Sequence, residues 1–339
     1  MKEFRKMSIE IIAELAQGFE GNPEQARLLI KAAATAGANA AKFQLVYADE
    51  LATPDYEHYQ LFKSLEMPND VWRDLSNLAS DLGIELQLDI FGIKSLHLSE
   101  ELGVKTIKLH GTDIANIGLL NEVAQSSIEK VLLGAGGAYV AELDRALEIL
   151  SSKQVVVLLG FQGYPTFTAD NQISRVILLV NRFKDSSQAV TIGFADHAEQ
   201  NTPLKYALAA AAIGAGAKVL EKHLTLARVM KLEDHESALN PDEFLEFTQT
   251  ILGCYSAMGV SNLLEDFGMS VGEQEYRKKI RRHVVASRNL KIGTIIEPND
   301  LALKRTSAKH IVTDIGSIYN MKLKEPLAQN QPITFAQFE

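Results

Sequence analysis

Ala189-Val-Thr-Ile-Gly-Phe-Ala-Asp-His197, and the stretch Val219-Leu-Glu-Lys-His-Leu-Thr225 that follows it, decide the predicted fold of this chain. Each is a run of strand-forming residues that ends at or near a histidine with a carboxylate close by. If the two strands are parallel neighbours, their carboxyl ends lie about 5 Å apart, and His197 and His223 reach one mouth. We interpret the two histidines as ligands of a divalent metal. The alternative is that each histidine caps its strand and satisfies backbone carbonyl groups.

The same unit, a short apolar run followed by a segment of helical period, recurs along the chain. Strands are predicted at Ile9–Leu15, Ala40–Leu45, Ile84–Ile90, Thr106–His110, Lys130–Ala135, Gln154–Gly160, Val190–Ala195 and Lys218–Thr225. About eight such β-then-α units favour an α/β fold of the (β/α)₈, or TIM-barrel, type. A doubly wound open sheet is the main alternative, because periodicity does not show closure.

Polar and ionisable residues recur at the ends of these strands. They are Glu14, Lys42, Gln44, Asp89, Lys108, His110, Gln162, His197, Glu221 and His223. In a barrel the carboxyl ends of the strands converge on the active site, so this pattern indicates an enzyme. Lys42 and Lys108 need a negative partner if they are buried. That partner is either Glu14 or Asp89 of the protein, or the phosphate and carboxylate of a ligand, and the sequence leaves both open.

The barrel pattern ends with a predicted helix at Pro241–Met258. We place the barrel domain at 1–260, a polar linker without strong periodicity at 261–280, and a β-rich module at 281–339. A module of about 60 residues has a limited core, so we expect it to lean on another surface.

Composition narrows the class of protein. The net charge of −9 disfavours a nucleic-acid surface, which needs clustered Lys and Arg. Cys254 is the single cysteine, which excludes a disulfide framework and indicates a reducing compartment. No window reaches the roughly 20 apolar residues of a membrane span. We therefore expect a cytoplasmic protein that acts on small molecules.

The order of motifs resembles the sialic acid synthase (N-acetylneuraminate synthase) family, in which a TIM barrel precedes an antifreeze-protein-like (SAF) domain. The matching stretches are Ile11-Ile-Ala-Glu14, Ala41-Lys-Phe-Gln44, Ile107-Lys108, Tyr164-Pro165, Ala195-Asp-His197, Leu220-Glu-Lys-His-Leu-Thr225, Asp234-His235, Arg282-His-Val-Val-Ala-Ser-Arg288 and Leu303-Lys-Arg305. They span nearly the whole chain.

The resemblance implies a metal-dependent transferase that forms a C–C bond between phosphoenolpyruvate and the aldehyde of an N-acylated hexosamine and releases phosphate. His197 and His223 would hold Mn²⁺, with Mg²⁺ as the alternative, and Glu14 would transfer protons. The resemblance further implies the substrate-binding residues Lys42, Lys108, Gln44, Gln162, Tyr164, Asp234 and Arg305. It also implies a homodimer in which the small domain, with its Arg305, covers the barrel of the partner subunit.

The chain departs from the family's usual motifs at several points. The departures are Gly18-Phe19 for Asn-His, Leu88-Asp-Ile-Phe91 for Ser-Thr-Pro-Phe, Gly111-Thr-Asp113 for Ser-Gly-Glu, Gly134-Ala-Gly-Gly137 for Ser-Thr-Gly-Met, Gly160-Phe-Gln-Gly163 for the segment with His-Cys-Thr, and Ala195 for Ser. Several lost hydroxyl groups would bind phosphoenolpyruvate, each worth about 1.5–3 kcal/mol. We therefore expect a divergent synthase. The alternatives are another metal-dependent barrel lyase or aldolase, and a catalytically silent sugar-binding paralogue.

Overall fold

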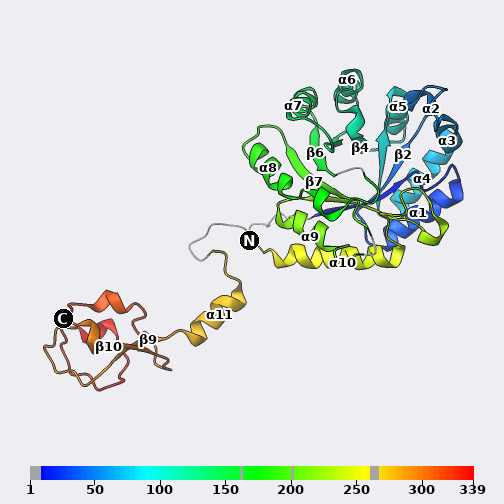
Figure 1. Cartoon of the computed structure of the whole chain (residues 1–339). Coiled ribbons are helices and arrows are strands. Elements are labelled where there is room, and N and C mark those ends of the chain that lie inside the picture. Colours follow the sequence, from blue (N-terminus) through cyan, green and yellow to red (C-terminus); the bar gives the residue numbers. More distant parts are fainter. Residues whose placement is uncertain (1–8, 161–162, 200–201, 260–266) are drawn as a thin grey trace. The chain divides into compact units, whose positions relative to one another are not determined.

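The predicted strands close into a barrel because the last strand pairs with the first. The computed structural model describes residues 9–160, 163–199, 202–259 and 267–339. Its barrel strands are β1 (Glu10–Ala16), β2 (Ala40–Leu45), β3 (Glu85–Ile90), β4 (Thr106–Leu109), β5 (Lys130–Gly134), β6 (Gln154–Leu159), β7 (Val190–Asp196) and β8 (Val219–His223). All are parallel, and β8 pairs with β1 over Glu10–Glu14 (Figure 1). The barrel prediction is confirmed, and the open sheet is excluded.

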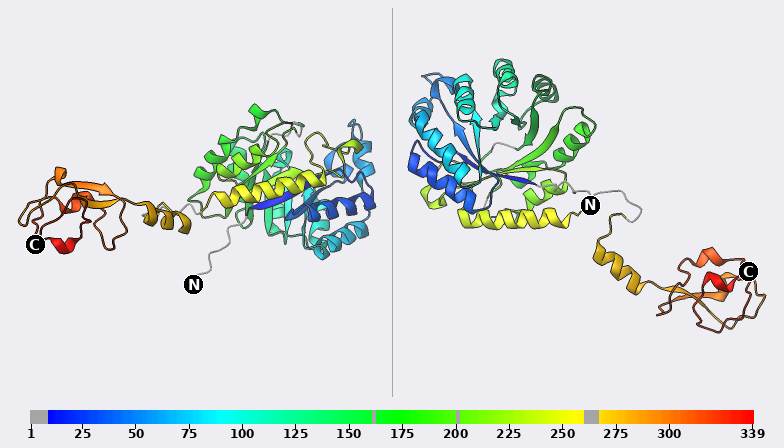
Figure 2. Two further views of the ribbon diagram at one scale, coloured as in Figure 1. Left: turned by 90° about the horizontal axis from the view of Figure 1, so that it is seen from below. Right: turned by 180° about the vertical axis from the view of Figure 1, so that it is seen from behind.

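Helices surround the strands, as the further views in Figure 2 show. They are α1 (Pro23–Thr35), α2 (Ala48–Leu51), α3 (Tyr59–Leu65), α4 (Asn69–Asp81), α5 (Ile93–Glu101), α6 (Ile117–Gln125), α7 (Val140–Ile149), α8 (Ser174–Phe183), α9 (Ala207–Gly214) and α10 (Pro241–Ala257). Asn22 and Pro23 begin α1, since the Asn22 side chain accepts from two backbone N–H groups and proline suits the first turn. In the described residues no helix combines the length and apolar character needed to cross a bilayer.

The barrel interior is layered because every second residue of a strand points inward. At the amino ends of the strands, Glu10 binds Lys130 and Gln87. Above them lies an apolar layer, formed by Ile12, Ala40, Leu132, Val156 and Val219. The inward-facing residues above this layer are largely charged. The apolar layer therefore separates the mouth of the barrel from its polar floor.

Phe19, one of the departures from the family's motifs, belongs to the hydrophobic core. Its side chain is fully buried, and its ring centroid lies 5.6 Å from that of Phe43 and 5.6 Å from that of Trp72, both in edge-to-face geometry. Phe43 comes from β2 and Trp72 from α4, so this aromatic cluster joins the loop after β1 to the outer wall of the barrel.

The C-terminal unit has a hydrophobic core of its own. The chain divides into two compact units, Met1–Gly259 and Val260–Glu339. In the second, β9 (His283–Ala286) pairs antiparallel with β10 (Leu301–Lys304) around a core that includes Val284, Ile296 and Leu323.

The polar linker prediction missed a helix. α11 (Val271–Ile280) forms where no periodicity was expected, with Ser270 accepting from the N–H of Glu273 at its start. No residue of α11 is buried, and a helix without an apolar stripe gives no hydrophobic period.

We expect Phe19→Ala to lower the free energy of unfolding of the barrel by about 3–5 kcal/mol, because it removes a buried aromatic ring from a packed cluster. Urea denaturation followed by the fluorescence of Trp72, the single tryptophan of the chain, measures the change. Leu28→Ala is the control, since Leu28 is 52% exposed on α1. A loss for Phe19→Ala no larger than for Leu28→Ala would contradict the packing role.

Candidate functional site

Five charged side chains lie inside the barrel above the apolar layer. They are Glu14, Lys42, Asp89, Lys108 and Glu221, called the buried charge cluster below, and each is at most 6% exposed. Lys42 forms an ion pair with Glu14, and its Nζ lies 3.4 Å from Glu221. The Nζ of Lys108 lies 2.8 Å from Glu221, 3.6 Å from Glu14 and 3.7 Å from Asp89. The protein therefore supplies the negative partners of both lysines.

Strand register brings this cluster together. Glu14 lies opposite Lys42 of β2 on one side and opposite His223 of β8 on the other. Asp89 lies opposite Lys108 of β4. β1 is bulged between Glu14 and Ala16, and the N–H of Ala16 donates to Glu14 at 2.8 Å. A bulge re-aims a side chain next to a site, and here it leaves Glu14 fixed by both a lysine and the backbone.

Burial and opposite charge shift the pKa values of the cluster in different directions. Burial raises the pKa of Glu14 in spite of Lys42. Burial alone would also raise the pKa of Glu221, but the ammonium groups of Lys108 and Lys42 lower it below its ordinary value. Burial raises the pKa of Asp89 to about 6, against the attraction of Lys108. Asp89 can thus take up a proton within about one pH unit of neutrality.

His197 and His223 lie side by side at the mouth, as their positions on neighbouring strands predicted. Their ring centroids are 5.2 Å apart, and both side chains are buried. The ring of Tyr164 packs against both, at centroid distances of 4.9 Å from His197 and 5.5 Å from His223. Asp234 places a carboxylate oxygen 3.8 Å from Nδ1 of His223.

The two histidines suit a divalent metal through the chemistry of their donors. Burial, and then the neighbouring His197, lower the pKa of His223 well below its ordinary value, so its imidazole is neutral, which is the form that binds metals. Across residues 9–160, 163–199, 202–259 and 267–339, no group of three or more His, Cys, Asp or Glu side chains is arranged to hold an ion. Two imidazoles would leave coordination positions for substrate and water, as catalytic sites require.

The remaining predicted residues are placed less uniformly. Gln44 lies on β2, two residues after Lys42, and accepts a hydrogen bond from the Gln17 side chain at 2.7 Å. Gln162 lies outside the described residues. Arg305 follows β10 in the C-terminal unit, where its Nε donates to the carbonyl of Ile280 at 3.3 Å.

Gly134, the last residue of β5, has a structural explanation. A Cβ on Gly134 would lie 2.6 Å from the backbone nitrogen of Gly111, so the end of β5 and the turn after β4 approach too closely for a side chain. Close backbone approach is a common reason for glycine. His110, just before this turn, bonds Thr112 at 2.9 Å, and burial and the charge of Lys108 lower its pKa to about 4.

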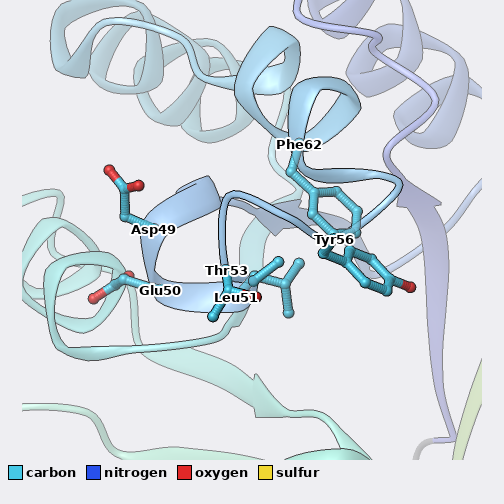
Figure 3. Close-up of a pocket in the computed structure, with 7 residues that line it drawn as sticks. Asp49, Glu50, Leu51, Thr53, Tyr56 and Phe62 are labelled. Carbon is cyan, nitrogen blue, oxygen red and sulfur yellow. The ribbon is translucent and has the colours of Figure 1, made fainter.

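The pocket of about 560 Å³ in the connection after β2 does not contain the cluster or the histidines. Figure 3 shows Asp49 and Glu50 of α2 on one side of it and the rings of Tyr56 and Phe62 on the other. Its acidic groups already have partners, since Glu50 accepts from the backbone N–H groups at the start of α5 and Asp49 from the hydroxyl of Tyr59. We therefore place the candidate site at the charge cluster and the histidines.

Glu221 was noted at a strand end but given no role from the sequence, whereas Glu14 and Asp89 were the carboxylates expected to pair with the lysines, and both lie beside them. Glu221 is the shared partner of both lysines. A signal was present in the spacing, since Glu221 stands two residues before His223 and must face the same side of β8. Its partners could not be read in the same way, because Lys108 is 113 residues away and reaches Glu221 across the interior.

Such a closed barrel, with ionisable groups gathered at the carboxyl ends of its strands, defines an enzyme-type (β/α)₈ protein with a second small domain. The profile of the NeuB family matches residues 29–262, and that of the SAF domain matches residues 281–339. The chain belongs to the NeuB family, which confirms the resemblance seen in its motifs.

Its relatives match over most of their length. An N,N'-diacetyllegionaminic acid synthase of Legionella pneumophila is 26% identical over 98% of this chain and 95% of its own. Another of the same description, from Campylobacter jejuni, is 28% identical over 93% of this chain and 97% of its own. The crystal structure of the N-acetylneuraminic acid synthetase of Leptospira borgpetersenii, in complex with citrate, superimposes with a TM-score of 0.72 at 26% identity, covering 81% of this chain and 93% of that one.

Asp89→Asn should stabilise the barrel at high pH. Folding raises the pKa of Asp89 from its ordinary 3.8 to about 6, so the folded state binds this proton more tightly than the unfolded state. The stability linked to that proton is complete below pH 4 and is lost as the pH rises through 6, which amounts to about 3 kcal/mol.

The asparagine variant should therefore gain up to about 3 kcal/mol in free energy of unfolding at pH 8 and little near pH 4. Urea denaturation at both pH values measures this. The exposed Asp81→Asn serves as control and should change stability by less than about 0.5 kcal/mol. Equal changes for the two variants at pH 8 would refute the assignment.

Proposed function

We propose that this protein is a nonulosonic acid synthase that joins phosphoenolpyruvate to the open-chain aldehyde of an N-acylated hexosamine, with release of phosphate. The observation that carries the proposal is that one barrel holds a candidate metal site and a candidate anion site. Paired histidines lie at the strand ends, and two lysines with a buried Glu14 lie inside the same barrel. Membership of the NeuB family and relatives named as synthases of legionaminic and neuraminic acids support it.

The reaction forms a C–C bond and, at C2 of the donor, replaces the C–O bond to phosphate by a C–O bond to water. C3 of phosphoenolpyruvate attacks the aldehyde carbon of the sugar, water adds at C2, and collapse of that centre expels phosphate and leaves a nine-carbon 2-keto acid. His197 and His223 would hold a divalent ion, Mn²⁺ with Mg²⁺ as the alternative. When bound, such an ion supplies Lewis-acid polarisation of the aldehyde oxygen.

The residues of the chain itself bind, orient and transfer protons. Lys42 and Lys108 would turn from their carboxylate partners to the anionic donor. Glu14, whose pKa is raised by burial, would then be free to accept a proton from the attacking water. Gln44, Tyr164, Asp234 and Gln162 would orient the sugar.

The decisive measurement is phosphate release from phosphoenolpyruvate with Mn²⁺ over a panel of acylated hexosamines and dideoxy-diacetamido hexoses. We expect release with one member of the panel, loss of release in EDTA, and loss in His197→Ala, because the ion is needed to polarise the aldehyde. Isothermal titration of Mn²⁺ into wild type and into His197→Ala shows whether the variant has lost its ion. Circular dichroism of the same samples shows whether it has kept its fold.

Two outcomes would favour other functions. Conversion of an aldehyde without phosphoenolpyruvate would indicate a lyase or aldolase of another type. Sugar binding without turnover of any panel member, in protein that binds Mn²⁺, would indicate a catalytically silent paralogue.

The proposal includes a cytoplasmic homodimer in which the C-terminal domain of one subunit completes the site of the other through Arg305. Glu14→Gln and Arg305→Ala should each be inactive as pure dimers. If Arg305 acts across subunits, a mixed dimer keeps one intact site, with Glu14 from one chain and Arg305 from the other. Random exchange of equal amounts should then restore about a quarter of wild-type activity.

Native mass spectrometry of the exchanged sample shows whether mixed dimers have formed. Mixed dimers without activity would mean that Arg305 acts within its own subunit or outside the site. A monomer at assay concentrations would exclude the shared site altogether.

A further inference from the structure

The buried charge cluster does not balance. Lys42 and Lys108 are its two cations, and Glu14, Asp89 and Glu221 are its three carboxyl groups. When all five are ionised, one negative charge is in excess inside the barrel. An excess charge without a partner is costly where water is excluded.

Asp89 is the carboxyl group with the weakest contacts. Glu14 is bonded by Lys42 and by the backbone of Ala16, and Glu221 is bonded by Lys108 at 2.8 Å. Asp89 is fully buried, yet within the described part of the chain neither of its oxygens has a hydrogen-bond partner. Its nearest cation is Lys108, whose Nζ lies 3.7 Å away.

The charges that face Asp89 come from every element around it. They are Glu14 of β1, Lys42 of β2, Lys108 of β4, Asp113 of the short 3₁₀ turn after β4, and Glu221 of β8. Three of the five are negative, and each of these three repels an ionised Asp89. A proton on Asp89 removes the excess negative charge without disturbing either lysine.

An incoming anion makes the imbalance worse. To bind it, Lys108 or Lys42 must share its N–H donors with the ligand, and the carboxylates lose part of their compensation. The added negative charge also repels Asp89 directly. If Asp89 is neutral, Lys108 no longer has an ionised partner there and can offer that contact to the anion.

We propose that Asp89 is a specificity-determining residue that couples the binding of an anionic ligand at Lys42 and Lys108 to the uptake of one proton. The barrel then accepts a phosphate or carboxylate readily in mildly acidic solution and increasingly poorly above neutral pH. Naming phosphoenolpyruvate as that anion rests on the proposed function, whereas the coupling does not.

The size of the effect follows from the fraction of protein in which Asp89 is protonated. With a pKa of about 6 in the free protein, that fraction falls about tenfold for each pH unit above 6, and the apparent Kd rises by the same factor. Asp89→Asn is neutral at every pH and should escape this loss. The ratio of the Kd of Asp89→Asn to that of wild type at each pH is independent of the ionisation of the ligand, because both proteins meet the same ligand.

The test is calorimetric titration of phosphoenolpyruvate, and separately of inorganic phosphate, into the full chain at pH 5.5, 7 and 8. Asp89→Asn should bind either anion about tenfold more tightly than wild type at pH 7 and about a hundredfold at pH 8, with near equality at pH 5.5. In buffers of different ionisation enthalpy, wild type should take up about one proton more than Asp89→Asn for each anion bound at pH 8.

Glu10→Gln is the matched control, because it removes one negative charge from the same barrel interior. Glu10 lies four residues before Glu14 on β1, about 13 Å away, on the far side of the apolar layer. Its affinity and proton uptake should equal those of wild type. Asp89→Ser provides a second neutral variant if the asparagine does not fold.

Weaker anion binding in Asp89→Asn would overturn the proposal, since it would mean that Asp89 itself contacts the ligand. Equal affinities of the neutral variants and wild type at pH 8, or no binding of either anion by any of them at millimolar concentration, would overturn it as well. Product formation is judged separately. If product forms but Asp89→Asn has the anion affinity of wild type, only the proposed coupling is wrong. If the anion affinity changes as expected but no product forms, only the proposed synthase function is wrong.

Discussion

The contact on which the mouth of this barrel depends is the shared ion pairing of Lys42 and Lys108 with Glu14 and Glu221. Lysines so deeply buried are tolerated only with anionic partners, and here the partners come from β1 and β8, the two strands whose pairing closes the barrel. Closure of the fold and neutralisation of the site are therefore one event. The lysines are therefore held in place without a ligand. A ligand that binds them must replace part of their contacts with the carboxylates.

The departures from the family's motifs divide into two kinds once their surroundings are known. Phe19 and Gly134 have packing reasons, because one fills an aromatic cluster and the other permits a close approach of two backbones. Asp89 has no such reason, since its oxygens gain no hydrogen bond within the described residues. A buried group that weakens the fold without packing gain is typical of positions kept for function.

Much of the barrel was predictable because its signals are local. Each strand is a short apolar run, and His197 and His223 stand at equivalent places in consecutive units, so their adjacency followed from the repeat. Glu14 and Asp89 were foreseen as possible partners of Lys42 and Lys108, but Glu221 was not, because it meets them only through closure of the barrel and across its interior. α11 was missed for a different reason, since a helix exposed on all sides leaves no apolar period to detect. The small domain was expected to have only a limited core, and its turns and bridges enclose a small one.

The apolar layer of Ile12, Ala40, Leu132, Val156 and Val219 also bears on how such a barrel can change over evolutionary time. It divides the interior into two compartments, each with its own charged groups: Glu10 with Lys130 below, and the five-membered cluster above. Within the described residues the charged groups of the two compartments form no ion pair with one another, so a mutation that alters charge in one acts on the other only through the weaker interaction over distance. Residues of the lower compartment can therefore change in ways that maintain folding while the charged groups of the upper compartment change to suit other substrates. The upper compartment can equally stay constant while the lower one changes.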